Sequence, residues 1–151
     1  MNLEQEFLLN MDKFHPKPRI INEWGPIADV LSESFSWKGS KIDWKCLGLH
    51  IEKPIDFKST QIEKEVEGFI KESGLYKFIN EGKIVYYVND SSLDFAVSLD
   101  SKIFLSFVIY VINNTPQHHY FLMRKRSGVL LLLQKVILTL VLGVNFLLIF
   151  V

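Results

Sequence analysis

A chain of 151 residues, 48% of them apolar, is long enough to bury a core of its own and too apolar to be disordered throughout. The 17 acidic and 17 basic residues balance, but every acid lies between Glu4 and Asp100, where 12 basic residues leave a net charge of −5. This acidic part argues against nucleic acid as the main partner, because phosphate binding needs a basic face, and it suits a basic protein partner.

The N-terminal part of the chain predicts two helices. Apolar residues recur at helical spacing between residues 3 and 13, and the prolines at 16 and 18 end this first helix. Asn22 is suited to capping a second helix, and the apolar face of that helix would comprise Trp24, Ile27, Ala28 and Leu31. The apolar stripe of the first helix comprises Leu3, Phe7, Leu8 and Met11.

The middle of the chain combines short strands with the clearest helical pattern. Apolar and aromatic residues between 36 and 51 favour a pair of strands around a turn at Lys38-Gly39-Ser40. A helix then runs to Gly74, and Thr60 and Glu63 near its start are spaced as in a capping box. The single apolar stripe of this helix consists of Ile62, Val66, Phe69 and Ile70.

β-Branched and aromatic residues then predict two strands, over residues 83–89 and 93–99. Because helical patterns precede these strands, we expect an α+β domain in which N-terminal helices pack on a mainly antiparallel sheet. Residues 103–112 are nearly all apolar, a pattern that fits either a buried strand or a buried helix. We expect this domain to comprise residues 1–121.

Residues 122–151 form a basic and then apolar tail. The basic stretch 124–126 is followed by residues 129–151, in which Lys135 is the only charge. As a helix, the apolar part would be about 34 Å long, enough to span a hydrocarbon core of ~30 Å, with the basic stretch as its cytoplasmic flank. Lys135 weakens the interpretation as a membrane anchor, because a lysine in the bilayer core costs about 2.5–3.5 kcal/mol on insertion scales.

Two other interpretations of the tail stay open. No acid occurs after Asp100, and three basic residues follow soon after the adjacent histidines, as expected if the tail is out-of-frame sequence and the chain is a truncated or frameshifted copy. A buried C-terminal helix is the third interpretation, which is disfavoured because a helix that is apolar on all sides needs a larger body to cover it. The sequence therefore predicts an apolar C-terminal helix or an aberrant tail.

No residue pattern points to catalysis. On an extended segment the adjacent side chains of His118 and His119 would point to opposite faces, and no cysteine or acid lies nearby to complete a zinc site. A glycine-rich phosphate loop and a Gly-x-Ser-x-Gly nucleophile elbow are both missing from the sequence. We expect no enzyme activity, no cofactor, no metal and structural histidines. The single thiol, Cys46, fits a reducing cytoplasm.

Tryptophans and acids together suggest a protein-binding surface. Three tryptophans stand within 21 residues, between Trp24 and Trp44, and most such side chains belong to a core. An exposed tryptophan beside carboxylates would instead suit an anchor in an interface with a basic protein. The candidate binding residues on this interpretation are Glu23, Trp24, Asp29, Glu33 and Asp43.

Three stretches occur in an order that resembles immunity proteins of bacterial contact-dependent growth inhibition and related polymorphic toxin systems. These stretches are FHPKPRIINEWGPIADVL, GFIKESGLYKFINEGKIVYYVNDSSLDFAVSLD and PQHHYF. The resemblance covers residues 1 to about 121, and its most specific element, Pro116-Gln117-His118-His119-Tyr120, is similar to the Pro-Gln-His motif that leads into the last strands of such proteins.

The resemblance implies a cytoplasmic protein that binds and neutralises one cognate secreted toxin domain by occlusion, without catalytic residues of its own. The tail departs from the pattern of that family, which continues with polar and aromatic strand sequence. The alternative function is therefore a small membrane-anchored protein, associated with the inner membrane through residues 129–151, that presents an acidic domain to the cytoplasm.

Overall fold

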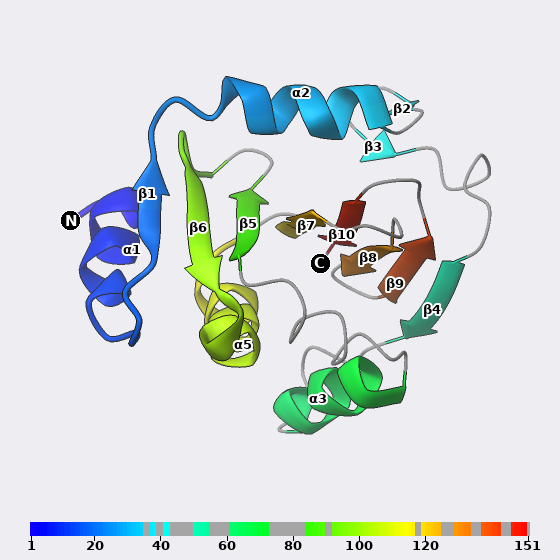
Figure 1. Cartoon of the computed structure of the whole chain (residues 1–151). Coiled ribbons are helices and arrows are strands. Elements are labelled where there is room, and N and C mark those ends of the chain that lie inside the picture. Colours follow the sequence, from blue (N-terminus) through cyan, green and yellow to red (C-terminus); the bar gives the residue numbers. More distant parts are fainter. Residues whose placement is uncertain are drawn as a thin grey trace.

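A computed structural model shows helices gathered around one main sheet, with a separate two-stranded sheet (Figure 1). The structure describes residues 1–34, 37–38, 41–42, 50–54, 61–72, 84–89, 92–116, 119–124, 129–133, 137–142 and 146–150. The helices are α1 (Leu3–Met11), α2 (Gly25–Ser34), α3 (Ile62–Glu72), the short 3₁₀ helix η2 (Ser101–Ile103) and α5 (Phe104–Asn114). The strands are β1 (Arg19–Ile21), β2 (Trp37–Lys38), β3 (Lys41–Ile42), β4 (His50–Pro54), β5 (Ile84–Asn89), β6 (Ala96–Asp100), β7 (His119–Arg124), β8 (Val129–Leu133), β9 (Ile137–Leu142) and β10 (Phe146–Phe150).

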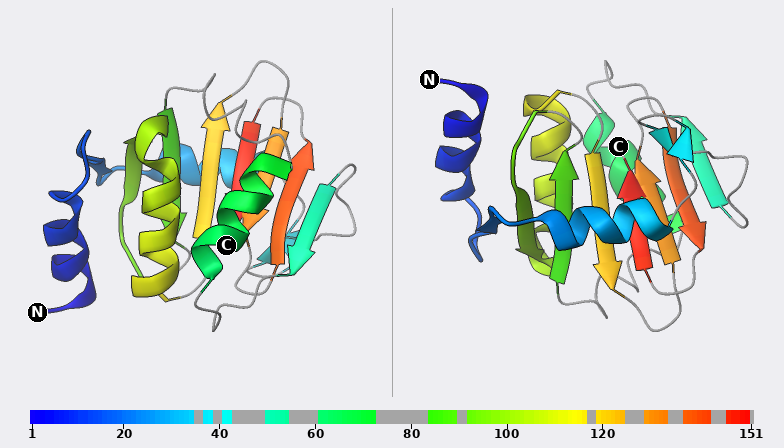
Figure 2. Two further views of the ribbon diagram at one scale, coloured as in Figure 1. Left: turned by 90° about the horizontal axis from the view of Figure 1, so that it is seen from below. Right: turned by 90° about the horizontal axis from the view of Figure 1, so that it is seen from above.

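The main sheet has the strand order β1-β6-β5-β7-β10-β9-β4, and β8 pairs with β7 and β9. Its strand pairs in the described residues are antiparallel, for example Tyr87 opposite Val97 on one side and Phe121 on the other. Figure 2 shows α3 and α5 on one face of this sheet, α2 across the opposite face, and α1 beside β1 at one end of the molecule. The predicted α+β class with helices on an antiparallel sheet is confirmed.

The two N-terminal helices occur where the sequence predicts them. A capping box fixes the start of α1, because the Asn2 side chain accepts the Gln5 N–H at 2.9 Å and the Gln5 side chain accepts the Asn2 N–H at 3.0 Å. Helix α2 begins later than its predicted cap at Asn22, since the first helical carbonyl, that of Trp24, accepts the Ala28 N–H at 3.0 Å. The predicted strand pair is also present, with Trp37 opposite Ile42.

Helix α3 carries the predicted stripe on its buried side, which packs against α5. The opposite side is charged and includes an ion pair between Lys71 and Glu67 at 3.3 Å. All four stripe residues are buried, namely Ile62, Val66, Phe69 and Ile70. Thr60, the predicted capping residue, lies outside the described residues.

Residues 103–112, for which the sequence left strand and helix open, lie almost wholly in helix α5. The Asp100 carboxylate accepts the Lys102 N–H at 2.8 Å and so caps the short η2 turn that leads into α5. Only one side of α5 is buried, at the helical spacing of Phe104, Phe107, Val108 and Val111. The apolar run is therefore long because partly buried residues on the flanks of the helix also pack against the core.

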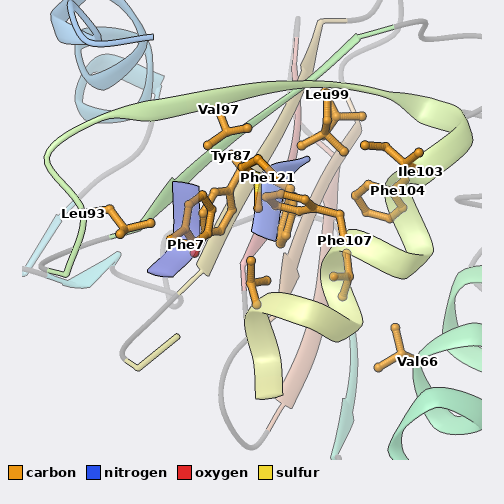
Figure 3. Packing of buried hydrophobic residues seen from close by; sticks show 14 of the residues in the cluster. Phe7, Val66, Tyr87, Leu93, Val97, Leu99, Ile103, Phe104, Phe107 and Phe121 are labelled. Atoms are coloured by element: carbon orange, nitrogen blue, oxygen red, sulfur yellow. The ribbon is translucent and has the colours of Figure 1, made fainter. Parts of the chain in front are cut away.

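The centre of the core is aromatic, and Figure 3 shows its rings converging from four elements. Phe7 comes from α1, Tyr87 from β5, Phe107 from α5 and Phe121 from β7. The ring centroids of Tyr87 lie 5.2 Å from Phe107 and 5.0 Å from Phe121, and those of Phe7 and Phe107 are 6.2 Å apart. These tilted and edge-on arrangements are the ones that aromatic quadrupoles favour. The N-terminal helix is thus joined to the sheet through ring contacts.

The C-terminal residues do not show the helix that was one of the expectations for residues 129–151. In the described part they form β8, β9 and β10, which extend the main sheet between β7 and β4. The strands are five or six residues long, and in the sequence Gln134-Lys135 and Gly143 to Asn145 divide the apolar part into stretches of five to seven residues, which have the length of buried strands. None of the helices in the described residues has the length and apolar character needed to cross a membrane.

Strand β7 runs from His119 to Arg124, across the predicted boundary between residues 121 and 122. On one side it pairs with β5 of the N-terminal part, and on the other with β10 of the tail. The division of the chain into a domain of residues 1–121 and a tail of residues 122–151 stays a prediction.

Polar groups in the core tie the loop before β7 to the sheet. The Tyr87 hydroxyl and His119 Nδ1 share a hydrogen bond of 2.8 Å, and both side chains are buried. Asn89 donates to the Pro116 carbonyl at 3.0 Å and accepts the Ser92 N–H at 2.7 Å. The structural role predicted for the histidines therefore holds for His119, whereas His118 lies outside the described residues.

We expect Tyr87→Phe to lower the free energy of unfolding by about 1–2 kcal/mol, because the buried Nδ1 of His119 loses the hydroxyl at 2.8 Å. Urea unfolding measures this change. Tyr86→Phe is the control, since Tyr86 is a half-buried neighbour on the same strand and faces the other side of the sheet. Equal effects of the two substitutions would contradict the buried hydrogen bond.

Candidate functional site

The predicted binding residues Glu23, Trp24 and Asp29 lie where β1 leads into α2 and in the first part of that helix. Glu23 and Asp29 are exposed, and Trp24 is half-buried. Trp24 is neither buried nor exposed, so it meets only in part the expectation of an exposed tryptophan beside carboxylates. Glu33 lies in α2, but only its backbone is described, and Asp43 lies outside the described residues.

The arrangement around Trp24 suits binding. The accessible part of a half-buried indole can contact an apolar pocket of a partner, and the carboxylates that precede and follow Trp24 in the sequence can meet cations there. In the part of the chain whose side chains are described, no ion pair joins Glu23 or Asp29 to a lysine or arginine. Helix α2 crosses an outer face of the molecule, so this site lies on its surface (Figure 2). We call Glu23, Trp24 and Asp29 the α2 site.

The structure adds a second surface that sequence reasoning missed, on the outer side of α1. Leu8 was expected in the apolar stripe of this helix, but 41% of it is exposed, and 58% of Leu9. The prediction for Leu8 is wrong because Phe7 and Met11 already face the core, and successive helical residues point about 100° apart. The signal was available, since Phe7, Leu8 and Leu9 are consecutive and cannot all face one side of a helix.

Helix α1 is held against α5 by aromatic contacts. The Tyr110 ring lies 5.7 Å from Phe7 and 5.8 Å from Phe14 between centroids. Burial raises the pKa of the Tyr110 phenol above its ordinary value of 10.0; a hydrogen bond with the Asn10 side chain lowers it, and the Glu6 carboxylate raises it. Because Asn10 and Glu6 both belong to α1, the ionisation of Tyr110 reports the position of that helix.

We expect Glu6→Gln to lower the pKa of Tyr110, because the carboxylate that disfavours the phenolate is removed. A near-ultraviolet absorbance titration measures this, with Tyr110→Phe to identify the signal and Glu63→Gln on α3 as the control. The raised pKa also makes the free energy of unfolding depend on pH. Since the pKa is raised on folding, the contribution of Tyr110 is complete below about pH 10 and is lost as the pH rises through the folded-state pKa. An identical pKa of Tyr110 in the wild type and in Glu6→Gln would contradict the electrostatic effect of Glu6 on Tyr110.

The described residues offer no candidate metal-binding cluster. They contain no group of three histidine, cysteine, aspartate or glutamate side chains that could hold a metal ion. His15 is exposed near the end of α1, while His119 is buried against Tyr87. The side chain of His50 is not described, and His118 lies outside the described residues.

No protein-family model, curated protein sequence or solved structure matches this chain. The resemblance to immunity proteins consequently stays an expectation that rests on the three stretches of sequence quoted above.

Proposed function

We propose that this protein is a cytoplasmic immunity protein that binds one cognate secreted toxin domain and neutralises it by covering its active surface. The observation that carries the proposal is the α2 site, where exposed carboxylates of Glu23 and Asp29 precede and follow the half-buried Trp24 in the sequence. The resemblance of residues 1–121 to immunity proteins and the net charge of −5 over residues 4–100 support it.

Electrostatics explains why an acidic inhibitor fits such a partner. Toxin domains that cleave nucleic acid carry basic surfaces, because their substrate is a polyanion. Unneutralised carboxylates on the inhibitor attract that surface at long range and raise the association rate, while a tryptophan filling a pocket slows dissociation. Inhibition by occlusion then needs no catalytic residue on this chain, and the proposal includes neither an enzyme activity nor a cofactor.

The test is protection of growing cells. The C-terminal domain encoded directly upstream of this gene is expressed from an inducible promoter, with and without the full chain. We expect the domain alone to stop growth and co-expression of this protein to restore it. Continued growth arrest with this protein present at levels above those of the domain would contradict the proposal, as would an upstream gene that encodes no toxic domain.

A further inference from the structure

We draw no further inference here: the strongest candidate, the exposed apolar surface of Leu8 and Leu9 on the outer side of α1, carries none, because nothing in the structure shows what covers it.

Discussion

Phe107→Ala is expected to lower the free energy of unfolding by about 3–5 kcal/mol, a large part of the 5–15 kcal/mol typical of a domain. The ring is fully buried, with 0% exposed, and lies at the meeting point of α1, α5 and the sheet. Its removal deletes apolar contact and leaves a cavity that the surrounding backbone can close only in part. The rings that lose this contact are Phe7, Phe14, Tyr87, Tyr110 and Phe121.

Chemical denaturation followed by circular dichroism measures this loss, and Phe14→Ala is the matched control. Phe14 also touches Phe107, with centroids 5.6 Å apart, but it is only partly buried, so the same substitution should cost roughly half as much or less. If both variants were equally stable, α5 would not be seated on the sheet through Phe107, and the description of the core would be wrong.

The second large effect is expected at the α2 site. Trp24→Ala should raise the Kd for the toxin domain by about 30- to 1,000-fold, which corresponds to about 2–4 kcal/mol. An aromatic anchor that fills a pocket contributes most when surrounding contacts exclude water from it, and the exposed Glu23 and Asp29 lie near Trp24 in the sequence. Titration calorimetry with an inactivated toxin domain gives the Kd of each variant.

Charge variants distinguish the effect of the carboxylates on the association rate from the effect of Trp24 on the dissociation rate. Glu23→Gln with Asp29→Asn should slow association mainly at low salt, while Trp24→Ala should speed dissociation at any salt concentration. Glu63→Gln, an exposed carboxylate on α3 across the sheet, is the control for loss of one charge. If Trp24→Ala lowered the melting temperature of the free protein and left the Kd unchanged, Trp24 would serve packing and the α2 site would fail.

The parts of the fold that the sequence predicted are those where one local pattern decides the structure. The stripe from Ile62 to Ile70 is amphipathic at a single period, so α3 follows from it directly. The apolar run 103–112 did not distinguish a helix from a strand. A helix at the centre of a small domain packs apolar residues on its flanks as well as on its buried side, and this hides the helical period. In the tail, polar interruptions set strand lengths, but total hydrophobicity suggested a long helix.

The sequence predicted which residues form the candidate site but not how exposed their side chains are. Acids next to Trp24 are visible in the sequence, whereas its half-exposed state depends on how α2 crosses the sheet, which is a tertiary property. Leu8 was placed in the apolar stripe of the first helix by its spacing alone, whereas its exposure depends on which side of α1 packs against the core. The buried bond between Tyr87 and His119 joins residues 32 positions apart and has no local signal.

The most direct test of the account is a titration of the upstream toxin domain with the full chain at low and at high salt. We expect saturable one-to-one binding, and an association rate that falls by about tenfold or more as salt screens the attraction between acidic and basic surfaces. Failure of the two proteins to bind at either salt concentration would contradict the immunity function. Binding with an association rate that does not depend on salt would contradict the proposed role of the carboxylates.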